Sequence, residues 1–116
     1  MNRAAIGRVC LALPAATLDH PFGDHHDAYR VGGKMFVMVG QEGGVSFKVS
    51  DIAYEVLTET GRARPAPYLA RAKWVNIADP GPAEGWTDAD LADHFASAHA
   101  IVAARLTKKV RADLGL

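Results

Sequence analysis

Two short turns separate three β-prone runs in the first half of the chain, and this spacing constrains the fold more than any other feature. The adjacent glycines Gly32-Gly33 lie between the runs Asp27–Val31 and Lys34–Val39, and the turn Gln41–Gly44 leads to Val45–Val49. Both central residues of a type I′ turn need positive φ, which glycine adopts without steric cost. Parallel strands would need long crossover connections instead. The spacing therefore predicts a three-stranded antiparallel meander.

The same glycines precede a lysine, so a phosphate-binding loop is an alternative interpretation. A Walker loop has four residues between its glycines, a Ser or Thr after the lysine, and a helix after that. Here the glycines are adjacent, Met35 follows Lys34, and a β-prone run comes next. The phosphate-loop interpretation fails, and Lys34 is predicted to stand at the protruding tip of a hairpin.

Helical spacing of apolar residues predicts three helices. They extend from Asn2 to about Leu13, from about Asp51 to Thr60, and from near Asp88 onward. The last one either continues or breaks and restarts through "RLTKKVRADLGL". Residues suited to capping or stopping helices stand at their ends: Asn2, Pro14, Ser50, Gly61 and Thr87.

Two further segments complete the expected organisation. Ala15 to Asp27 mixes histidines and aspartates with Pro21 and Gly23 without any period, which is typical of a loop. The stretch "KWVNIA", Lys73 to Ala78, alternates as a strand does. The order is helix, three strands, helix, strand, helix. We therefore expect one α+β domain over residues 1–116, an antiparallel sheet with helices packed on one face.

Composition restricts the function classes. The chain has 116 residues and is 49% hydrophobic, and its 13 basic residues balance 13 acidic ones. Total charge therefore neither attracts nucleic acid nor indicates disorder, and only charge placement is informative. The single cysteine, Cys10, excludes an intrachain disulfide and favours a reducing, cytoplasmic setting. No apolar run reaches the roughly 20 residues of a membrane span. We expect no membrane association, and a monomer or weak homodimer.

The motifs of the sequence give little support for metal binding or catalysis. His20, His25 and His26 lie among aspartates, and both residue types bind divalent metals. Their spacing matches no metal motif, and a polar loop explains the composition equally well. No serine has a Gly-x-Ser-x-Gly setting, and Cys10 lies among apolar residues. We expect a non-enzyme without a metal or cofactor.

Segregated charge is the remaining signal. No acidic residue lies between Glu59 and Asp79, and this interval carries four cations and two aromatics: Arg62, Arg64, Arg71, Lys73, Tyr68 and Trp74. Such a surface could neutralise phosphates and stack bases. Alternatively, Trp74 packs into the core and the cations pair with the acidic block that follows. The sequence leaves both interpretations open.

These residues resemble a known family. The segment "LALPAATLDHPFGDHHDAYRVGGKMFVMVG" is similar to the N-terminal half of MmcQ/YjbR proteins, and "KWVNI" and "LTKKVR" are similar to motifs of the second half. The resemblance covers nearly the whole chain. It departs at "YLAR", Tyr68 to Arg71, where the family pattern has a His and an Asn.

The resemblance implies a frataxin-like (CyaY-like) fold and a proposed double-wing mode of DNA binding. Frataxin-like iron handling is set aside, because the first predicted helix contains no Asp or Glu. The first hypothesis is therefore a non-catalytic DNA-binding protein that recognises the phosphate backbone. Its expected contact residues are Lys34, Lys48, Arg62, Arg64, Tyr68, Arg71, Lys73 and Trp74.

The second hypothesis is a module for a small anionic ligand or a protein partner, with Trp74 as a wall of a cleft between the Tyr68–Trp74 segment and the "PFG" loop. A third possibility is that the basic residues are ordinary solvated faces.

Overall fold

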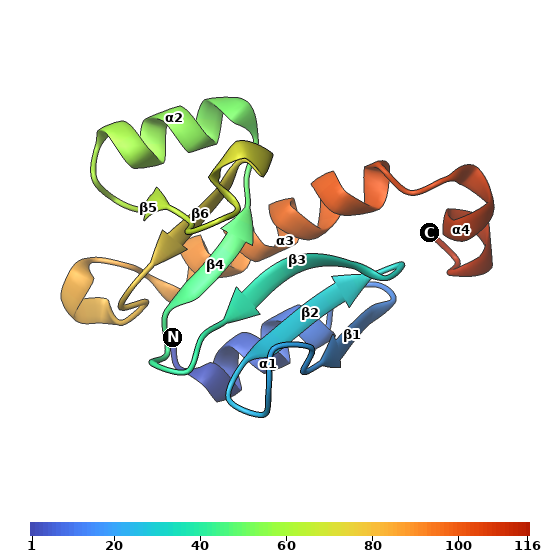
Figure 1. Ribbon diagram of the computed structural model, residues 1–116, viewed down its shortest axis with the longest axis horizontal. Coiled ribbons are helices and arrows are strands. Elements are labelled where there is room, and N and C mark those ends of the chain that lie inside the picture. The colour runs from blue at the N-terminus through green and yellow to red at the C-terminus, as the bar shows by residue number, and fades with distance from the viewer.

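One antiparallel sheet of six strands organises the chain (Figure 1). The computed structural model describes residues 1–116. Strand order in the sheet is β1-β2-β3-β4-β6-β5, so β1 and β5 form its two edges. The strands are β1 (Ala16–Asp19), β2 (Asp27–Val31), β3 (Lys34–Val39), β4 (Val45–Lys48), β5 (Arg64–Pro65) and β6 (Trp74–Ile77).

The predicted meander is confirmed as β2, β3 and β4. Gly32 and Gly33 connect β2 to β3 with φ of +56° and +79°, the left-handed values that a type I′ turn requires. Val31 pairs directly with Lys34 across this turn, and Val39 pairs with Val45 across the next one. Glycine is used here for its backbone freedom, and Lys34 stands exposed beside the turn as expected.

Four α-helices and two short 3-10 turns complete the fold. They are α1 (Arg3–Leu11), α2 (Asp51–Glu59), η1 (Ala70–Ala72), η2 (Pro82–Glu84), α3 (Asp88–Ala104) and α4 (Lys108–Asp113). The side chains of Asn2, Ser50 and Thr87 accept backbone N–H bonds at the starts of α1, α2 and α3, as predicted. The last helical segment breaks after α3 and restarts as α4. No helix has both the length and the apolar character that crossing a bilayer demands.

The core lies between the sheet and its helices. Phe47 of β4 packs edge-on against Phe95 of α3, and Tyr29 of β2 lies under Gly7 of α1. Leu57 of α2 joins the same apolar cluster as these residues. Figure 1 shows α1 and α3 together behind the sheet and α2 beside its β5–β6 end. The predicted α+β class, an antiparallel sheet with helices on one face, is therefore confirmed.

The predicted element order missed two strands, both at sheet edges. Ala16–Asp19 lies in the segment expected to be a loop, yet it pairs with β2 in register from Ala16↔Val31 to Asp19↔Ala28. Its residues Ala16, Thr17, Leu18 and Asp19 alternate apolar and polar, but the run has only four residues, is mostly exposed and buries no apolar face, so its strand signal is weak. Arg64–Pro65 pairs with β6, and proline is tolerated there because the strand is an edge.

Candidate functional site

An opening between β3 and β4 creates a hollow at one end of the sheet. Pairing of the two strands extends only from Val39↔Val45 to Val37↔Phe47, so β3 leaves β4 over Lys34–Phe36 (Figure 1). A hollow of about 460 Å³ lies there. We call it the basic hollow, and its lining residues are Lys34, Met35, Lys48, Leu69, Ala72, Trp74, Val102 and Arg105.

Three cations from three separate elements line the basic hollow. Lys34 comes from the hairpin turn, Lys48 ends β4, and Arg105 is the C-cap of α3. Lys34 and Arg105 are exposed, and no Asp or Glu belongs to the lining. Because like charges accumulate there without a lining counter-ion, the hollow is suited to an anionic ligand.

Lys48 differs from the other two cations because it is only 4% exposed. Its ammonium donates a hydrogen bond to the Ala72 carbonyl and thereby ties β4 to η1. Burial lowers the pKa of Lys48, Arg105 and Lys73 lower it further, and Asp51 opposes them. Lys48 therefore adds positive potential to the hollow from below the surface, whereas its exposed neighbours Lys34 and Arg105 are the cations that a ligand can contact directly.

The arm between β5 and β6 presents an aromatic side chain to solvent. Tyr68 is fully exposed and has φ of +65°, a left-handed value that is unusual for a residue with a side chain. Lys73, at the end of the same arm, has φ of +60°, and its ammonium lies 4.7 Å from the centre of the Tyr54 ring. Arg71, in η1, is exposed. Backbone strain of this kind is found at functional sites.

Trp74 lies in the wall of the basic hollow. It is 6% exposed and stands outside the main apolar cluster. The "PFG" loop, Pro21–Gly23, is not the opposite wall of this hollow: it follows β1, the edge strand farthest from β5 and β6. The expectation of a cleft between the two segments is therefore wrong, because β3 and β4 lie between the strands that the two segments connect.

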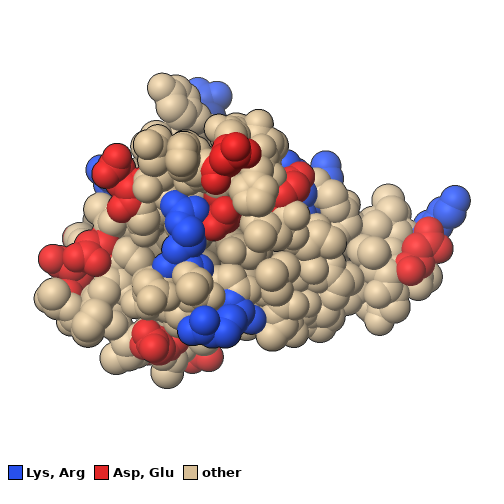
Figure 2. All heavy atoms as spheres, turned by 90° about the horizontal axis from the view of Figure 1, so that it is seen from below, with Lys and Arg blue, Asp and Glu red and all other residues tan.

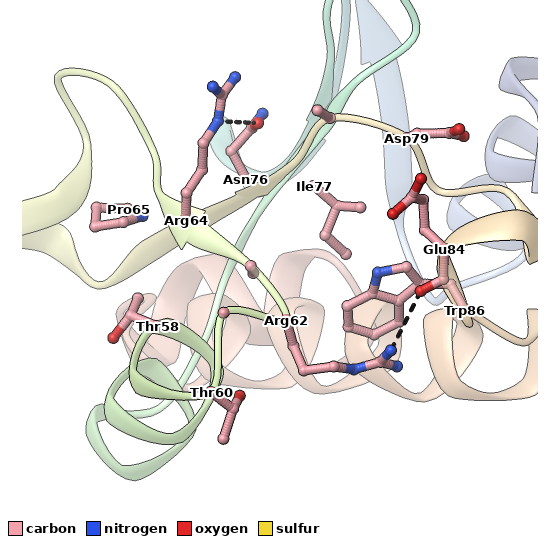
Figure 3. A pocket seen from close by; sticks show the side chains of 13 residues that line it. Thr58, Thr60, Arg62, Arg64, Pro65, Asn76, Ile77, Asp79, Glu84 and Trp86 are labelled. Atoms are coloured by element: carbon pink, nitrogen blue, oxygen red, sulfur yellow. Dashed lines mark hydrogen bonds between the residues drawn. The ribbon is translucent and has the colours of Figure 1, made fainter.

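Arg62 and Arg64 line a second pocket, of about 580 Å³, between the end of α2, β5–β6 and η2 (Figure 3). The Arg62 guanidinium lies 4.0 Å from the centre of the Trp86 ring and donates to the carbonyls of Glu84 and Gly85 at 3.4 and 3.3 Å. Arg64 Nε donates to Asn76 Oδ1 at 2.9 Å. The structure does not bring these two arginines into the basic hollow.

The histidine-rich loop is tied to α1. Asp27, which is buried, accepts a 2.7 Å bond from Arg3 and lies 3.1 Å from His20 Nε2. Arg3 also donates to the carbonyls of His25 and Gly40. No group of three His, Cys, Asp or Glu side chains is placed to hold a metal ion. The arrangement closes the β1–β2 loop onto the helix.

Arg105 is the one cation of the basic hollow that was not among the contact residues predicted from the sequence. It belongs to the basic segment "RLTKKVRADLGL", through which the last predicted helix either continues or restarts, and nothing along the chain links that segment to the Lys34 hairpin. A usable signal was the position of the basic segment: a helix that starts near Asp88 and ends at this segment has a cation at its C-terminal end, where cations are favoured.

Comparisons with known proteins agree with this fold. A family model described as YjbR matches residues 11–101. The crystal structure of the Deinococcus radiodurans protein DR2400, described as a DUF419 domain, is similar with a TM-score of 0.81 and 22% identity. That similarity covers 96% of this chain and 86% of the other. Among curated proteins, none matches. At such low identity the solved structure supports the fold alone.

Proposed function

This chain belongs to the YjbR family, and from that premise we propose that it is a non-catalytic DNA-binding protein that contacts the phosphate backbone through the end of the molecule around the basic hollow. The observation that carries the proposal is that Lys34, from the hairpin, and Arg105, from α3, line one hollow together with Lys48 and Trp74. Phosphate contacts of this kind give affinity that depends on salt and little on sequence.

Charge segregation along α3 supports the proposal despite the net charge of zero. Its first turns carry Asp88, Asp90 and Asp93, whereas Arg105 caps its other end. The segment that follows adds Lys108, Lys109 and Arg111. A neutral protein with separated charge presents a positive end to a polyanion and keeps its acidic end away.

The face seen in Figure 2 is a poor alternative for such contacts. There, Lys and Arg form small groups with Asp and Glu close by, and no unbroken basic band crosses it. Some cations of the molecule are already paired: Arg30 Nε donates to both carboxylate oxygens of Asp19 at 3.0 Å. Cations already paired with carboxylates gain less from a phosphate than unpaired ones do.

The exposure of each side chain decides its role in the proposed interface. Lys34, Arg71, Lys73 and Arg105 would contact phosphate, because each has exposed or half-buried surface and none forms an ion pair. Tyr68, fully exposed on its arm, would stack on an unpaired base. Lys48 would contribute its charge from below. Arg62 and Arg64 are outside this interface.

We place the protein in the cytoplasm, since its single cysteine, Cys10, is free and buried.

Anisotropy titration of a labelled DNA duplex tests the proposal. We expect Lys34→Ala and Arg105→Ala each to weaken binding several-fold, by the roughly 1 kcal/mol that an exposed charge pair contributes. Arg8→Ala is the matched control, because exposed Arg8 lies near the start of α3, about 25 Å of helix from Arg105. Equal affinities for all four proteins would contradict the assigned surface.

A small anionic ligand in the same hollow is the second candidate. Its apolar lining, which includes Leu69, Trp74 and Val102, would suit a ligand with a flat or aliphatic body. Stabilisation by a mononucleotide or another small anion in a thermal-shift screen, together with no retardation of DNA, would favour this function.

A further inference from the structure

The pocket of Figure 3 holds charges of both signs that do not neutralise one another. Two arginines, Arg62 and Arg64, and two acids, Asp79 and Glu84, belong to its lining. No ion pair within 4.0 Å joins any of them, since the ion pairs of the molecule all lie elsewhere. Opposite charges held apart across one pocket can be bridged by a ligand that carries both.

Two of the four charged groups have the free atoms needed. Arg64 uses only its Nε, on Asn76, which leaves both terminal nitrogens of the guanidinium free of protein partners. The Glu84 carboxylate has no hydrogen-bond partner, because the hydrogen bonds of Glu84 all involve its main-chain N–H and carbonyl. Figure 3 shows Arg64 on one side of Ile77 and Glu84 on the other. A guanidinium is suited to bind a carboxylate through two parallel bonds.

The other two charged groups are already engaged. Asp79 accepts the Gly81 N–H at 2.9 Å, and Arg62 lies over Trp86 and bonds two main-chain carbonyls. Arg62 therefore covers the indole and separates it from solvent, which explains why Trp86 is buried although it lines the pocket. Any ligand that displaces or contacts Arg62 would change the surroundings of the indole.

We infer that this pocket binds a small amino-acid zwitterion, its carboxylate on Arg64 and its ammonium on Glu84. The volume of about 580 Å³ accommodates such a ligand with its first waters. Both charged side chains are exposed, so screening keeps the affinity modest, with a dissociation constant in the millimolar range. The site is independent of the basic hollow and of DNA binding.

Trp86 fluorescence reports on this site when the other tryptophan is replaced by Trp74→Phe. The probes are glycine, β-alanine and γ-aminobutyric acid, whose charges are separated by one methylene more at each step. We expect at least one probe to change Trp86 emission saturably. Its N-acetyl and amide derivatives, which lack one charge each, should give no saturable change.

Variants connect the signal to the two side chains. Glu84→Gln and Arg64→Gln should each weaken binding about tenfold, the loss expected for one charged hydrogen-bonding partner. Glu55→Gln and Lys108→Gln, exposed residues outside the pocket, should not change it. Thermal unfolding of each variant verifies folding. No saturable response to any probe, equal responses to the blocked derivatives, or insensitivity to both pocket variants would each overturn the inference.

Discussion

Lys34 and Arg105 line the same hollow although one lies on a hairpin near the N-terminal third of the chain and the other caps the last long helix. Neither has an acidic partner. Two like charges held beside one cavity repel in the free protein, and a polyanion relieves that repulsion.

Replacing Lys34 with Gln should lower DNA affinity without lowering stability. The ammonium makes no hydrogen bond and no ion pair in the structure, and its removal relieves repulsion by Arg105 and Lys48. Urea unfolding and DNA titration of the same Lys34→Gln sample measure the two effects. A large loss of stability together with unchanged affinity would mean that Lys34 has a structural role instead.

Removing the Tyr68 side chain should weaken binding to single-stranded DNA more than binding to duplex. The ring is fully exposed, so Tyr68→Ala should leave the free energy of unfolding nearly unchanged, whereas losing one base stack costs about 1–3 kcal/mol of binding. Tyr68→Gly should even stabilise the fold, because glycine adopts φ of +65° without strain. Parallel anisotropy titrations with both kinds of DNA, and thermal unfolding, provide the readouts. Equal losses on single strands and duplex would argue against stacking.

The two turn glycines should respond unequally to alanine. Both have positive φ, so each substitution carries a backbone cost of about 1–2 kcal/mol. At Gly32 the added Cβ would also lie 2.6 Å from Leu106 Cδ1, whereas at Gly33 it would meet nothing within 4 Å. Gly32→Ala should therefore be the more destabilising by urea midpoint, with Gly33→Ala as its control. The reverse order would show that Leu106 does not pack under the turn.

Much of the fold follows from local signals that the structure confirms. Gly32-Gly33 predicted the hairpin, because few residues tolerate two successive positive φ values. Ser50 and Thr87 predicted helix starts, because the side chain of each accepts a hydrogen bond from the backbone N–H three residues further along. Edge strands β1 and β5 gave no such signal. They depend on pairing with β2 and β6, because β1 alternates over only four, mostly exposed residues and β5 has only two residues.

The candidate site was less predictable for a related reason. Lys34 and Trp74 were predicted on two different elements, and they line one hollow because β3 is not paired with β4 before Val37, over Lys34–Phe36. Sequence proximity also grouped Arg62 and Arg64 with Arg71, although a turn and β5 direct the first two into another pocket. A run of charged residues along a chain does not indicate on which face of the folded protein each side chain lies.

His94 should make stability fall in mild acid. Burial lowers the pKa of His94 from its ordinary 6.5, Asp90 and Asp93 oppose this, and Arg62 lowers it further. The unfolded chain then binds the proton more readily than the folded protein, so this contribution is present above pH 6.5 and is lost as pH falls from 6.5 through the folded pKa. His94→Gln should flatten that part of the urea-midpoint curve, whereas His25→Gln in the exposed loop should not. Parallel curves for all three proteins would contradict this account.

Cys10 should resist modification in the folded protein. Burial raises the pKa of its thiol to about 12, and the side chain has no exposed surface. Alkylation by iodoacetamide near neutral pH should therefore be slow in buffer and fast in urea, as followed by mass spectrometry. Prompt labelling without denaturant would mean that α1 opens readily from the sheet.

The dependence of DNA affinity on salt tests the central claim most directly. We predict that the logarithm of the association constant falls linearly with the logarithm of the salt concentration, with a slope of about −0.9 for each phosphate neutralised. The double variant Lys34→Ala with Arg105→Ala should have a slope shallower by roughly 2. An association constant that does not change with salt, or an identical slope in the double variant, would contradict recognition of the phosphate backbone by the basic hollow.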